Sequence, residues 1–318
     1  MVVTYGEALV DLIEQLDGSF AAILGGSVCN FTLAVARQGL PAAYLNPLSN
    51  DSFGARFVDQ LGAAGVVLAA PQRSLLPTAL AVVTLDAHGV PSYAFHRALV
   101  ADRDITLAQA VATLPPAITL FHTGGLALVP ADLDVTLGVA AAAAAAGALI
   151  SIDANLRPLA VPDLALYAAG VRRALALAHL IKVSEEDLLY LGLQDADPVV
   201  AARTLFDGSA AQLVALTLGG QGAVLLARSG QVALPVPPGV SVVDTVGAGD
   251  CFQAGLVASL HQAGALTLDA LPGLDPGTLT RALRYALATA SIDVMRKGCN
   301  PPLREEVEDF LTTTGAAA

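Results

Sequence analysis

The sequence has 318 residues, of which 55% are hydrophobic, so the chain is long enough to bury a large core. Its formal net charge is −12, with 16 Lys and Arg residues against 28 Asp and Glu residues. This excess of acid argues against non-specific binding to nucleic acid or to an anionic membrane. An anionic ligand would have to be held locally, by backbone amides, a metal ion or a few arginines.

The amino-terminal segment MVVTYGEALVDL predicts a first strand at 2–5 and no secretory signal, because it lacks a basic start and reaches Glu7 and Asp11 early. The chain has three cysteines, Cys29, Cys251 and Cys299, which are far apart and in no metal-ligand spacing. We therefore expect neither a disulfide framework nor a zinc site. These features favour a cytoplasmic protein.

The next segments suggest a glycine turn before a helix and a small separate sheet. Gly25 and Gly26 would let the backbone approach a ligand closely, and Asn30 offers a donor and an acceptor, although an ordinary glycine loop fits as well. Residues 8–23 alternate without helical character, and residues 79–97 read as a hairpin with its turn at 86–89. These stretches, extended to about 8–24 and 76–100, could pair as a lid or as surface decoration.

Short apolar runs, most of them followed by Gly, Asn, Asp or Ser, predict the core strands. Alanine-rich helical stretches between them indicate repeated βαβ units and a mainly parallel, doubly wound α/β sheet. The uncharged stretch 135–152 approaches the length of a membrane span, but we interpret it as a surface helix that runs into a buried strand. No linker divides the chain, which predicts one domain over 1–318. The candidate strands are 2–5, 43–45, 119–122, 148–152, 180–183 and 213–217.

The stretch VVDTVGAGDCFQAG, residues 242–255, places Gly247, Ala248 and Gly249 where a strand gives way to a helix. Free amides and the helix dipole at such a turn suit an anion. A Rossmann turn would need a third glycine at position 252, which is Phe252, and a Walker loop would need Gly-Lys-Ser/Thr.

Asp250 distinguishes phosphate binding from phosphate transfer. A carboxylate beside a bound pyrophosphate would repel it, whereas a phosphotransferase needs a group that accepts the proton of the attacking hydroxyl. The amides of Gly247 to Gly249 would then stabilise charge on the phosphoryl oxygens. The alternative on local chemistry is that Asp250 caps the helix.

DTVGAGDCFQAGL closely resembles the carboxy-terminal signature of the PfkB, or ribokinase-like, carbohydrate kinases. The resemblance implies a ribokinase-like α/β fold, with Asp250 as the catalytic base and Gly247, Ala248 and Gly249 as the anion hole. It also implies that Asp244 and Thr245 hold the loop near a monovalent cation or the triphosphate.

Further segments follow the order of this family. GGSVCNFTLAVARQG resembles its amino-terminal signature, with Thr32 in place of the usual Ala and Gln38 in place of Leu. GEALVD and DANLRP resemble its sugar-binding segments, and DANLRP would emerge at the carboxyl end of a strand, where open α/β sheets bind ligands. The residues that the resemblance assigns to the sugar are Asp11, Gly25, Gly26, Asn30, Asn155 and Arg157, with Arg97 as a further candidate.

Three segments resemble the nucleotide side of the family. KVSEEDLL looks like its magnesium and phosphate motif, with Ser184 and Asp187 in place of Asn and Glu, which predicts Mg²⁺ contact through water or a plain helix cap at Ser184. TLGGQGAVL resembles the turn near the ATP phosphates and ribose, and RKGCNPP the segment near adenine and potassium. The nucleotide-side residues are Ser184, Thr217, Gly219, Gly220, Gly222, Thr245, Gly298 and Asn300, with Asp187 and Asp244 toward metal.

The resemblance predicts an ATP-dependent sugar kinase that uses Mg²⁺, with K⁺ as an additional candidate and a homodimer formed through the lid. DANLRP and KGCNPP look most like bacterial fructokinases, so fructose is the first expectation. 2-Keto-3-deoxygluconate is an alternative, since Arg97 and Arg157 could meet its acid group, although Phe95 lies where those enzymes have a tyrosine. Ribokinase or nucleoside kinase activity, an NAD-dependent dehydrogenase and a non-catalytic sugar-binding protein also stay open.

Overall fold

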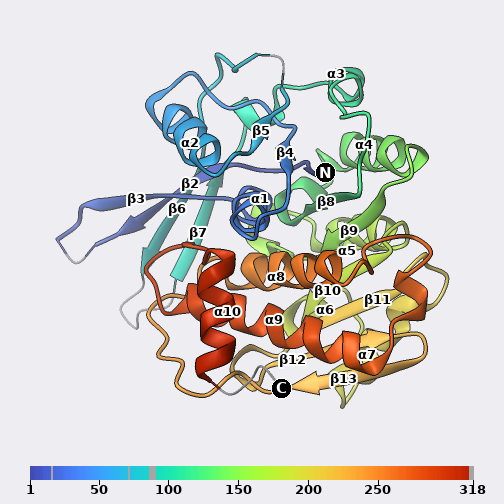
Figure 1. Ribbon diagram of the computed structural model, residues 1–318. Helices are drawn as coiled ribbons and strands as arrows, with labels where there is room; N and C mark the ends of the chain where they lie inside the picture. The colour runs from blue at the N-terminus through green and yellow to red at the C-terminus, as the bar shows by residue number, and fades with distance from the viewer. Residues whose placement is uncertain (16, 71, 86–90, 315–318) are drawn as a thin grey trace.

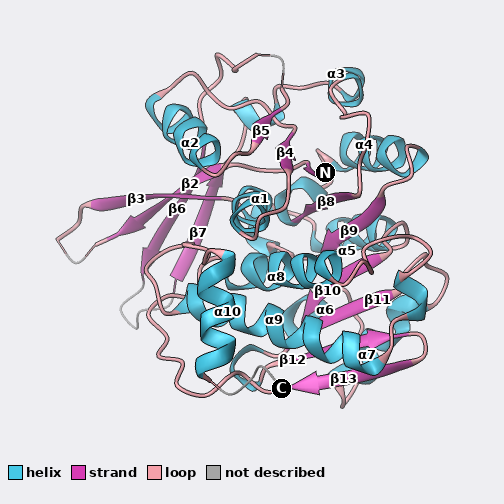
Figure 2. Cartoon of the chain, viewed as in Figure 1, coloured by secondary structure: helices cyan, strands magenta, loops and turns pink. Residues whose placement is uncertain are grey.

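The computed structural model describes residues 1–15, 17–70, 72–85 and 91–314, and it contains two β-sheets of unequal size. The larger sheet runs through the body of the molecule and has helices on both faces (Figure 1). The smaller sheet projects from one side of this body, on the left in Figure 2. The predicted doubly wound sheet with a second, small sheet is therefore confirmed.

The larger sheet has nine strands in the order β13-β12-β11-β10-β9-β8-β1-β4-β5. All neighbours from β11 to β5 pair in parallel, and β12 and β13 add an antiparallel edge. The carboxyl ends of the parallel strands therefore meet at one edge, where the ligand sites of such sheets lie. The strands are β1 Val2–Thr4, β4 Ala42–Tyr44, β5 Val67–Leu68, β8 Leu120–Gly124, β9 Leu149–Asp153, β10 Leu180–Ser184, β11 Leu213–Thr217, β12 Ala223–Ala227 and β13 Gly230–Leu234.

Each buried strand supplies two apolar cores, because successive side chains point to opposite faces of the sheet. In β9, Leu149 belongs to the core on the side of the carboxy-terminal helices, together with residues such as Leu256. Ile150 and Ile152 belong to the core on the opposite face, together with residues such as Val139. A strand buried on both faces reads as a continuous apolar run. For this reason the runs in the sequence identified β1, β4, β8, β9, β10 and β11, whereas β5, β12 and β13 were not among the candidate strands.

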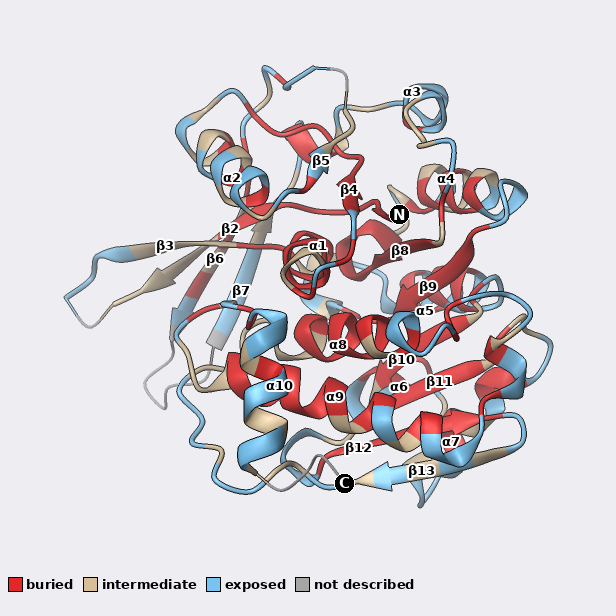
Figure 3. Ribbon diagram, viewed as in Figure 1, coloured by how far each residue is buried: buried red, intermediate tan, exposed pale blue. Residues whose placement is uncertain are grey.

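The helices cover both faces of the large sheet, and α8 is buried along most of its length (Figure 3). Helices α8 and α9 pack against each other in front of the sheet in Figure 1, and α8 also packs against α1. The helices are α1 Ser27–Arg37, α2 Ser52–Ala63, α3 Leu107–Ala112, α4 Leu133–Ala145, α5 Leu164–Leu175, α6 Glu185–Tyr190, α7 Pro198–Arg203, α8 Ala248–Gln262, α9 Pro276–Val294 and α10 Arg304–Thr313.

The smaller sheet has the strand order β3-β2-β6-β7. It consists of two antiparallel pairs, β2 with β3 and β6 with β7, joined by parallel pairing of β2 with β6. Its strands are β2 Leu9–Glu14, β3 Phe20–Gly25, β6 Ala79–Leu85 and β7 Pro91–His96. The predicted turn at 86–89 lies outside the described residues.

The alanine-rich stretch folds as predicted, into α4 followed by the buried strand β9. Val139, Ala140 and Ala143 are the face of α4 that contacts the sheet. Among the described residues, no helix combines the length and apolarity needed to cross a membrane.

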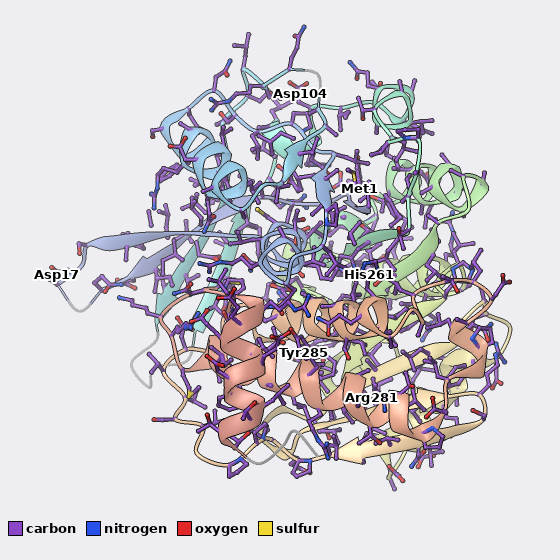
Figure 4. The ribbon with its side chains drawn as sticks, in the orientation of Figure 1. Met1, Asp17, Asp104, His261, Arg281 and Tyr285 are labelled. Atoms are coloured by element: carbon purple, nitrogen blue, oxygen red, sulfur yellow. The ribbon has the colours of Figure 1, made fainter. Side chains whose placement is uncertain are left out.

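The two departures from the amino-terminal signature are buried and hydrogen-bonded. Thr32 Oγ1 lies 2.7 Å from Thr4 Oγ1 and donates to the Val28 carbonyl. Gln38 accepts from the hydroxyl of Tyr285, labelled on α9 in Figure 4, and donates to the Pro302 carbonyl. Gln38 therefore connects α1 to α9 and to the segment before α10.

Candidate active site

The site is centred on the amino terminus of α8, which begins in a left-handed turn. Gly247 is the N-cap with φ 86°, a conformation that disfavours any side chain. A Cβ at this position would also lie 2.4 Å from Cys299 Sγ. The first amides of a helix have no acceptor within the helix, and the dipole adds positive potential there. The turn that includes Ala248 and Gly249 can therefore receive an anion.

Asp250 lies in the first turn of α8, but its side chain points to α1. Its Oδ1 accepts a 2.6 Å hydrogen bond from Ser27 Oγ, and its Oδ2 accepts a 2.9 Å bond from Asn30 Nδ2. The N-cap of α8 is Gly247, which has no side chain, and the two oxygens of Asp250 bond to α1 in place of the helix's own backbone. Burial raises the pKa of Asp250, and the bonds from Ser27 and Asn30 oppose that rise.

Ser27 joins the acid to the sugar-side residues, and sequence reasoning treated it only as a helix start. Its Oγ accepts a 2.7 Å hydrogen bond from Asn155 Nδ2 while it donates to Asp250. Its backbone N–H donates to Glu7 Oε1 at 3.0 Å. Glu7 is 2% exposed, and burial raises its pKa to about 7. Asn155 and Asp250 thus bond to one hydroxyl, and Asn30 bonds to the other oxygen of the same acid.

Lys182 is a second residue that the sequence analysis missed. It lies on β10 with its Nζ 3.1 Å from Asp153 Oδ2 on β9, and both side chains are buried. A Cβ on Gly249 would lie 2.8 Å from Lys182 Nζ, so the ammonium lies directly against the glycine turn. Burial alone would lower the pKa of Lys182, but the carboxylates around it, Asp153 first, raise it. A charged ammonium therefore adds to the positive potential of the turn.

Asp11 lies on β2 in the small sheet and faces the same site. It pairs in register with Ile23, whose side chain would be 3.3 Å from a Cβ on Gly298, so this face of the sheet is turned toward the loop around 298. A Cβ on Gly25 would lie 2.6 Å from Asp11 Oδ2. Burial raises the pKa of Asp11 to about 6, and Arg157 opposes the rise.

Gly26 lies close against neighbouring backbone, whereas Arg157 is exposed. Gly26 has φ 100°, and a Cβ there would lie 2.6 Å from the Glu7 carbonyl oxygen. Arg157 is exposed and donates to the carbonyls of Asn155 and Leu156.

Arg97 is half-buried, with 10% of its side chain exposed, and it is paired. It lies 3.0 Å from Asp102 and 3.4 Å from Asp132, and it donates to the Leu126 carbonyl. Together with Glu7 it lines a cavity of about 390 Å³, whose wall does not include Asp250. The cavity and the acid are nevertheless adjacent, because Glu7 contacts Ser27.

Ser184 and Asp187 form a reciprocal cap at the start of α6. Asp187 Oδ2 accepts from the N–H and the hydroxyl of Ser184, both at 2.8 Å, and Asp187 Oδ1 accepts from Leu156 N at 2.8 Å. The helix cap that the sequence allowed for Ser184 is therefore present. Asp187 also fixes the segment DANLRP to α6.

The glycine turn after β11 is shaped partly by strand pairing. Gly222 has φ 106°, and a Cβ there would lie 2.1 Å from the Leu234 carbonyl oxygen, so the β12–β13 pair alone requires a glycine. Gly219 has φ 54°, and Gly219 and Gly220 are exposed. Thr217 Oγ1 donates to the Val183 carbonyl at 3.4 Å, at the carboxyl end of β11.

Asp244 connects the segment before the anion turn to the loop after α9. Its Oδ1 accepts from Val246 N at 3.1 Å and its Oδ2 from Gly298 N at 2.8 Å. Thr245, which follows it, is exposed, and Asn300 Oδ1 accepts from Arg37. The structure thus brings the loop of Gly298 next to the turn of α8. Their wide separation in the sequence gave no indication of this contact.

The chain is similar to carbohydrate kinases along nearly its whole length. The profile described as "pfkB family carbohydrate kinase" matches residues 1–306. A fructokinase from Rhizobium leguminosarum bv. trifolii is 33% identical over 283 residues, which cover 88% of this chain and 85% of that protein. A crystal structure of a fructokinase with bound ATP from Xylella fastidiosa has a TM-score of 0.86 and 30% identity, with 99% of each chain covered.

A fructokinase from Vibrio cholerae O395, solved with fructose, ADP and a calcium ion, has a TM-score of 0.82 and 26% identity over 98% of each chain. Its double mutant was solved with fructose, ADP and a potassium ion. A kinase profile over nearly the whole chain leaves no support for a nicotinamide-dependent dehydrogenase. The chain belongs to the pfkB family of carbohydrate kinases.

Proposed function

We propose that this protein is an ATP-dependent fructokinase that transfers the γ-phosphoryl group of ATP to a primary hydroxyl of fructose. The observation that carries the proposal is the position of Asp250, a buried acid held by Ser27 and Asn30 beside the amide turn of Gly247 to Gly249. One end of the site can receive phosphate and the other can hold a polyol. The relatives solved with ATP and with fructose support both assignments.

In this proposal, Asp250 accepts the proton of the attacking hydroxyl. A carboxylate whose pKa is raised by burial holds a proton more strongly than an exposed one, which makes it a better base as long as it remains ionised at neutral pH. The bonds from Ser27 and Asn30 favour its ionised form and fix its direction. Asn155 orients the Ser27 hydroxyl from the opposite side.

The phosphoryl group would lie against the amino terminus of α8. The amides of Gly247, Ala248 and Gly249 and the ammonium of Lys182 point positive charge at the place where negative charge develops during transfer. Because these groups are fixed before the substrates bind, little reorganisation is needed in the transition state. Lys182 thus joins the proposed catalytic residues.

Fructose is favoured over 2-keto-3-deoxygluconate by the state of the arginines. Arg97 already faces Asp102 and Asp132, so its charge is compensated and offers little to the carboxylate of an acidic sugar. Asp11, Asn30 and Asn155 are instead suited to the hydroxyls of a neutral sugar. Arg157, which is exposed, stays a proposed contact to sugar or phosphate.

Mg²⁺ is the proposed metal ion of the ATP complex, and bound there it would neutralise charge on the phosphates. Asp187 fits contact through water better than direct ligation, because its two oxygens already accept three hydrogen bonds. Asp244 is the proposed carboxylate beside K⁺. Ser184, Thr217, Gly219, Gly220, Gly222, Thr245, Gly298 and Asn300 stay proposed nucleotide-side residues.

The small sheet is proposed to close over the sugar and to exclude water from the phosphoryl group. The sheet carries exposed Phe20 and Tyr93, at 46% and 39%, which fits the proposed homodimer through this element. A cytoplasmic location is proposed from the free cysteines, Cys29, Cys251 and Cys299.

A coupled ADP-release assay tests the proposal. Purified protein is incubated with ATP, Mg²⁺ and either fructose, 2-keto-3-deoxygluconate, ribose or adenosine, with and without K⁺. We expect the highest kcat/KM with fructose. A higher value with the acidic sugar would contradict the argument from Arg97, and no sugar-dependent ADP release from any of them would contradict the kinase assignment.

A further inference from the structure

A cluster of two thiols and one carboxylate lies directly behind the turn that carries Asp250. Cys251 follows Asp250 in α8, Asp293 lies near the end of α9, and Cys299 lies in the loop after it. The Sγ atoms of both cysteines and a carboxylate oxygen of Asp293 all lie within 4.8 Å of one another. Helix α8 and the segment 293–299, which are far apart in the sequence, thus supply three potential metal ligands, which the spacing of the cysteines did not indicate.

The carboxylate of Asp293 is only half satisfied. Asp293 is 0% exposed, and its Oδ1 accepts a 2.8 Å hydrogen bond from Asn300 N, whereas its buried Oδ2 has no hydrogen-bond partner among the described residues. A buried polar atom without a partner costs about 1–3 kcal/mol, so its presence calls for an explanation. Burial raises the pKa of Asp293 to about 6, with the Asn300 N–H and the nearby Cys251 thiol opposing the rise.

We propose that Cys251, Asp293 and Cys299 form a binding site for a thiophilic divalent cation, with Zn²⁺ as the best fit. Two thiolates and one carboxylate match the ligand preferences of Zn²⁺ and not those of Mg²⁺ or K⁺, which take oxygen ligands. With Zn–S distances of about 2.3 Å and Zn–O distances of about 2.0 Å, tetrahedral ligand atoms lie roughly 3.5–3.8 Å apart. The three atoms therefore need to approach by roughly 1.0–1.3 Å at most, and water can take the fourth position.

The binding step releases protons and needs no redox partner. Each thiol loses its proton to solvent as its sulfur binds the cation, so affinity rises with pH. Cys251 is fully buried, and Cys299 is half-buried and supplies the route of entry. The site uses neither Asp187 nor Asp244, the carboxylates proposed beside Mg²⁺ and K⁺, and it shares with the proposed K⁺ side only the segment that contains Cys299.

A cation bound at this site would affect the phosphate turn through Gly247. The Sγ of Cys299 lies so close to Gly247 that an added Cβ would be 2.4 Å away, and Cys251 is bonded to Asp250 along the chain. Drawing Sγ toward Cys251 changes the contact that supports the N-cap of α8. We therefore expect Zn²⁺ to lower kcat without competing with sugar; this effect, unlike the binding itself, rests on the proposed kinase function.

Binding is tested on reduced, metal-free protein without substrates. Co²⁺ serves as the spectroscopic probe, because thiolate ligands give charge-transfer absorption in the near ultraviolet, and Zn²⁺ affinity is measured by competition with a chromophoric chelator. We expect one Zn²⁺ per chain, and a loss of affinity of at least about 10-fold in Cys299→Ser and in Asp293→Asn. Cys29→Ser is the matched control, since Cys29 is buried in α1 outside the cluster.

Folding is checked for each variant by its thermal transition without metal, and Zn²⁺ should raise the Tm of wild type and Cys29→Ser but not of Cys299→Ser. The absence of thiolate absorption, or equal affinity in wild type and Cys299→Ser, would overturn the site. The activity arm is separate. Zn²⁺ binding without inhibition of an active kinase would overturn the coupling to Gly247, and a protein with no kinase activity would affect only the proposed function.

Discussion

Replacement of Asp250 by Asn tests the central assignment with almost no change of shape. The introduced amide can turn its oxygen toward Asn30 Nδ2 and its nitrogen toward Ser27 Oγ, so both present contacts keep a partner. The substitution also removes a buried charge whose pKa is already raised, so we expect the variant to fold and to be at least as stable as wild type. The variant does lose the group that accepts the proton.

General base catalysis contributes about 10²–10⁴-fold, so kcat of Asp250→Asn should fall by that factor, equivalent to about 2.7–5.4 kcal/mol of activation free energy. The ADP-release assay gives kcat, and isothermal calorimetry gives the affinities for fructose and for ATP, which should stay close to wild type. A kcat within about 10-fold of wild type, in a variant that binds both substrates, would refute the role of Asp250 as base.

Three further predictions test the surroundings of the acid. Lys182→Met combined with Asp153→Asn removes both members of the buried ion pair, so neither charge is left without the other. The double variant should have a kcat about 10²–10³-fold lower, with little change in the KM for fructose, as measured by steady-state kinetics. An unchanged kcat would reject the proposed role of the ammonium. Gly247 and Gly239 both have left-handed backbone conformations, but of the two only Gly247 would bring an added Cβ into close contact with a neighbour. Gly247→Ala should therefore unfold at a lower denaturant concentration than Gly239→Ala, with a free energy of unfolding lower by about 1–3 kcal/mol. Equal unfolding midpoints for the two variants would contradict this prediction. Burial raises the pKa of Glu7 from 4.5 to about 7, so the folded state binds its proton more tightly than the unfolded state. The free energy of unfolding should therefore fall by roughly 3 kcal/mol as pH rises through this range. Urea unfolding between pH 5 and 8 should show a flatter dependence on pH in Glu7→Gln than in wild type. An identical slope in wild type and variant would exclude Glu7 as its source.

The sequence predicted most of the fold because doubly buried strands produce apolar runs. Strands β9, β10 and β11 were found within a residue or two of their bounds for this reason. The edge strand β13 alternates between exposed and half-buried residues and has no such run, so it was not among the predicted strands. An edge strand of this kind can be predicted only when the strand that it pairs with is known.

The candidate site was predictable only where one motif carries the chemistry. Gly247 to Asp250 share one turn, so a local pattern revealed them. Ser27 meets Asp250 across 223 positions of the chain, and Lys182 reaches the glycine turn from a strand in which it reads as a lone charge in an apolar run. Such contacts come from the packing of α1, α8 and β10, and they cannot be inferred from the spacing of residues in the sequence.

The pairing of α1 with α8 separates two tasks that a kinase must perform. Ser27, Asn30 and Asp250, the last of them the proposed base, lie where helices α1 and α8 pack together, whereas Asp11 lies on the small sheet. Both of these hydrogen bonds to Asp250 come from α1 and not from the small sheet. Substitutions in the small sheet, to which we assign the proposed sugar contact of Asp11, can therefore alter sugar selection while the proposed base keeps its position.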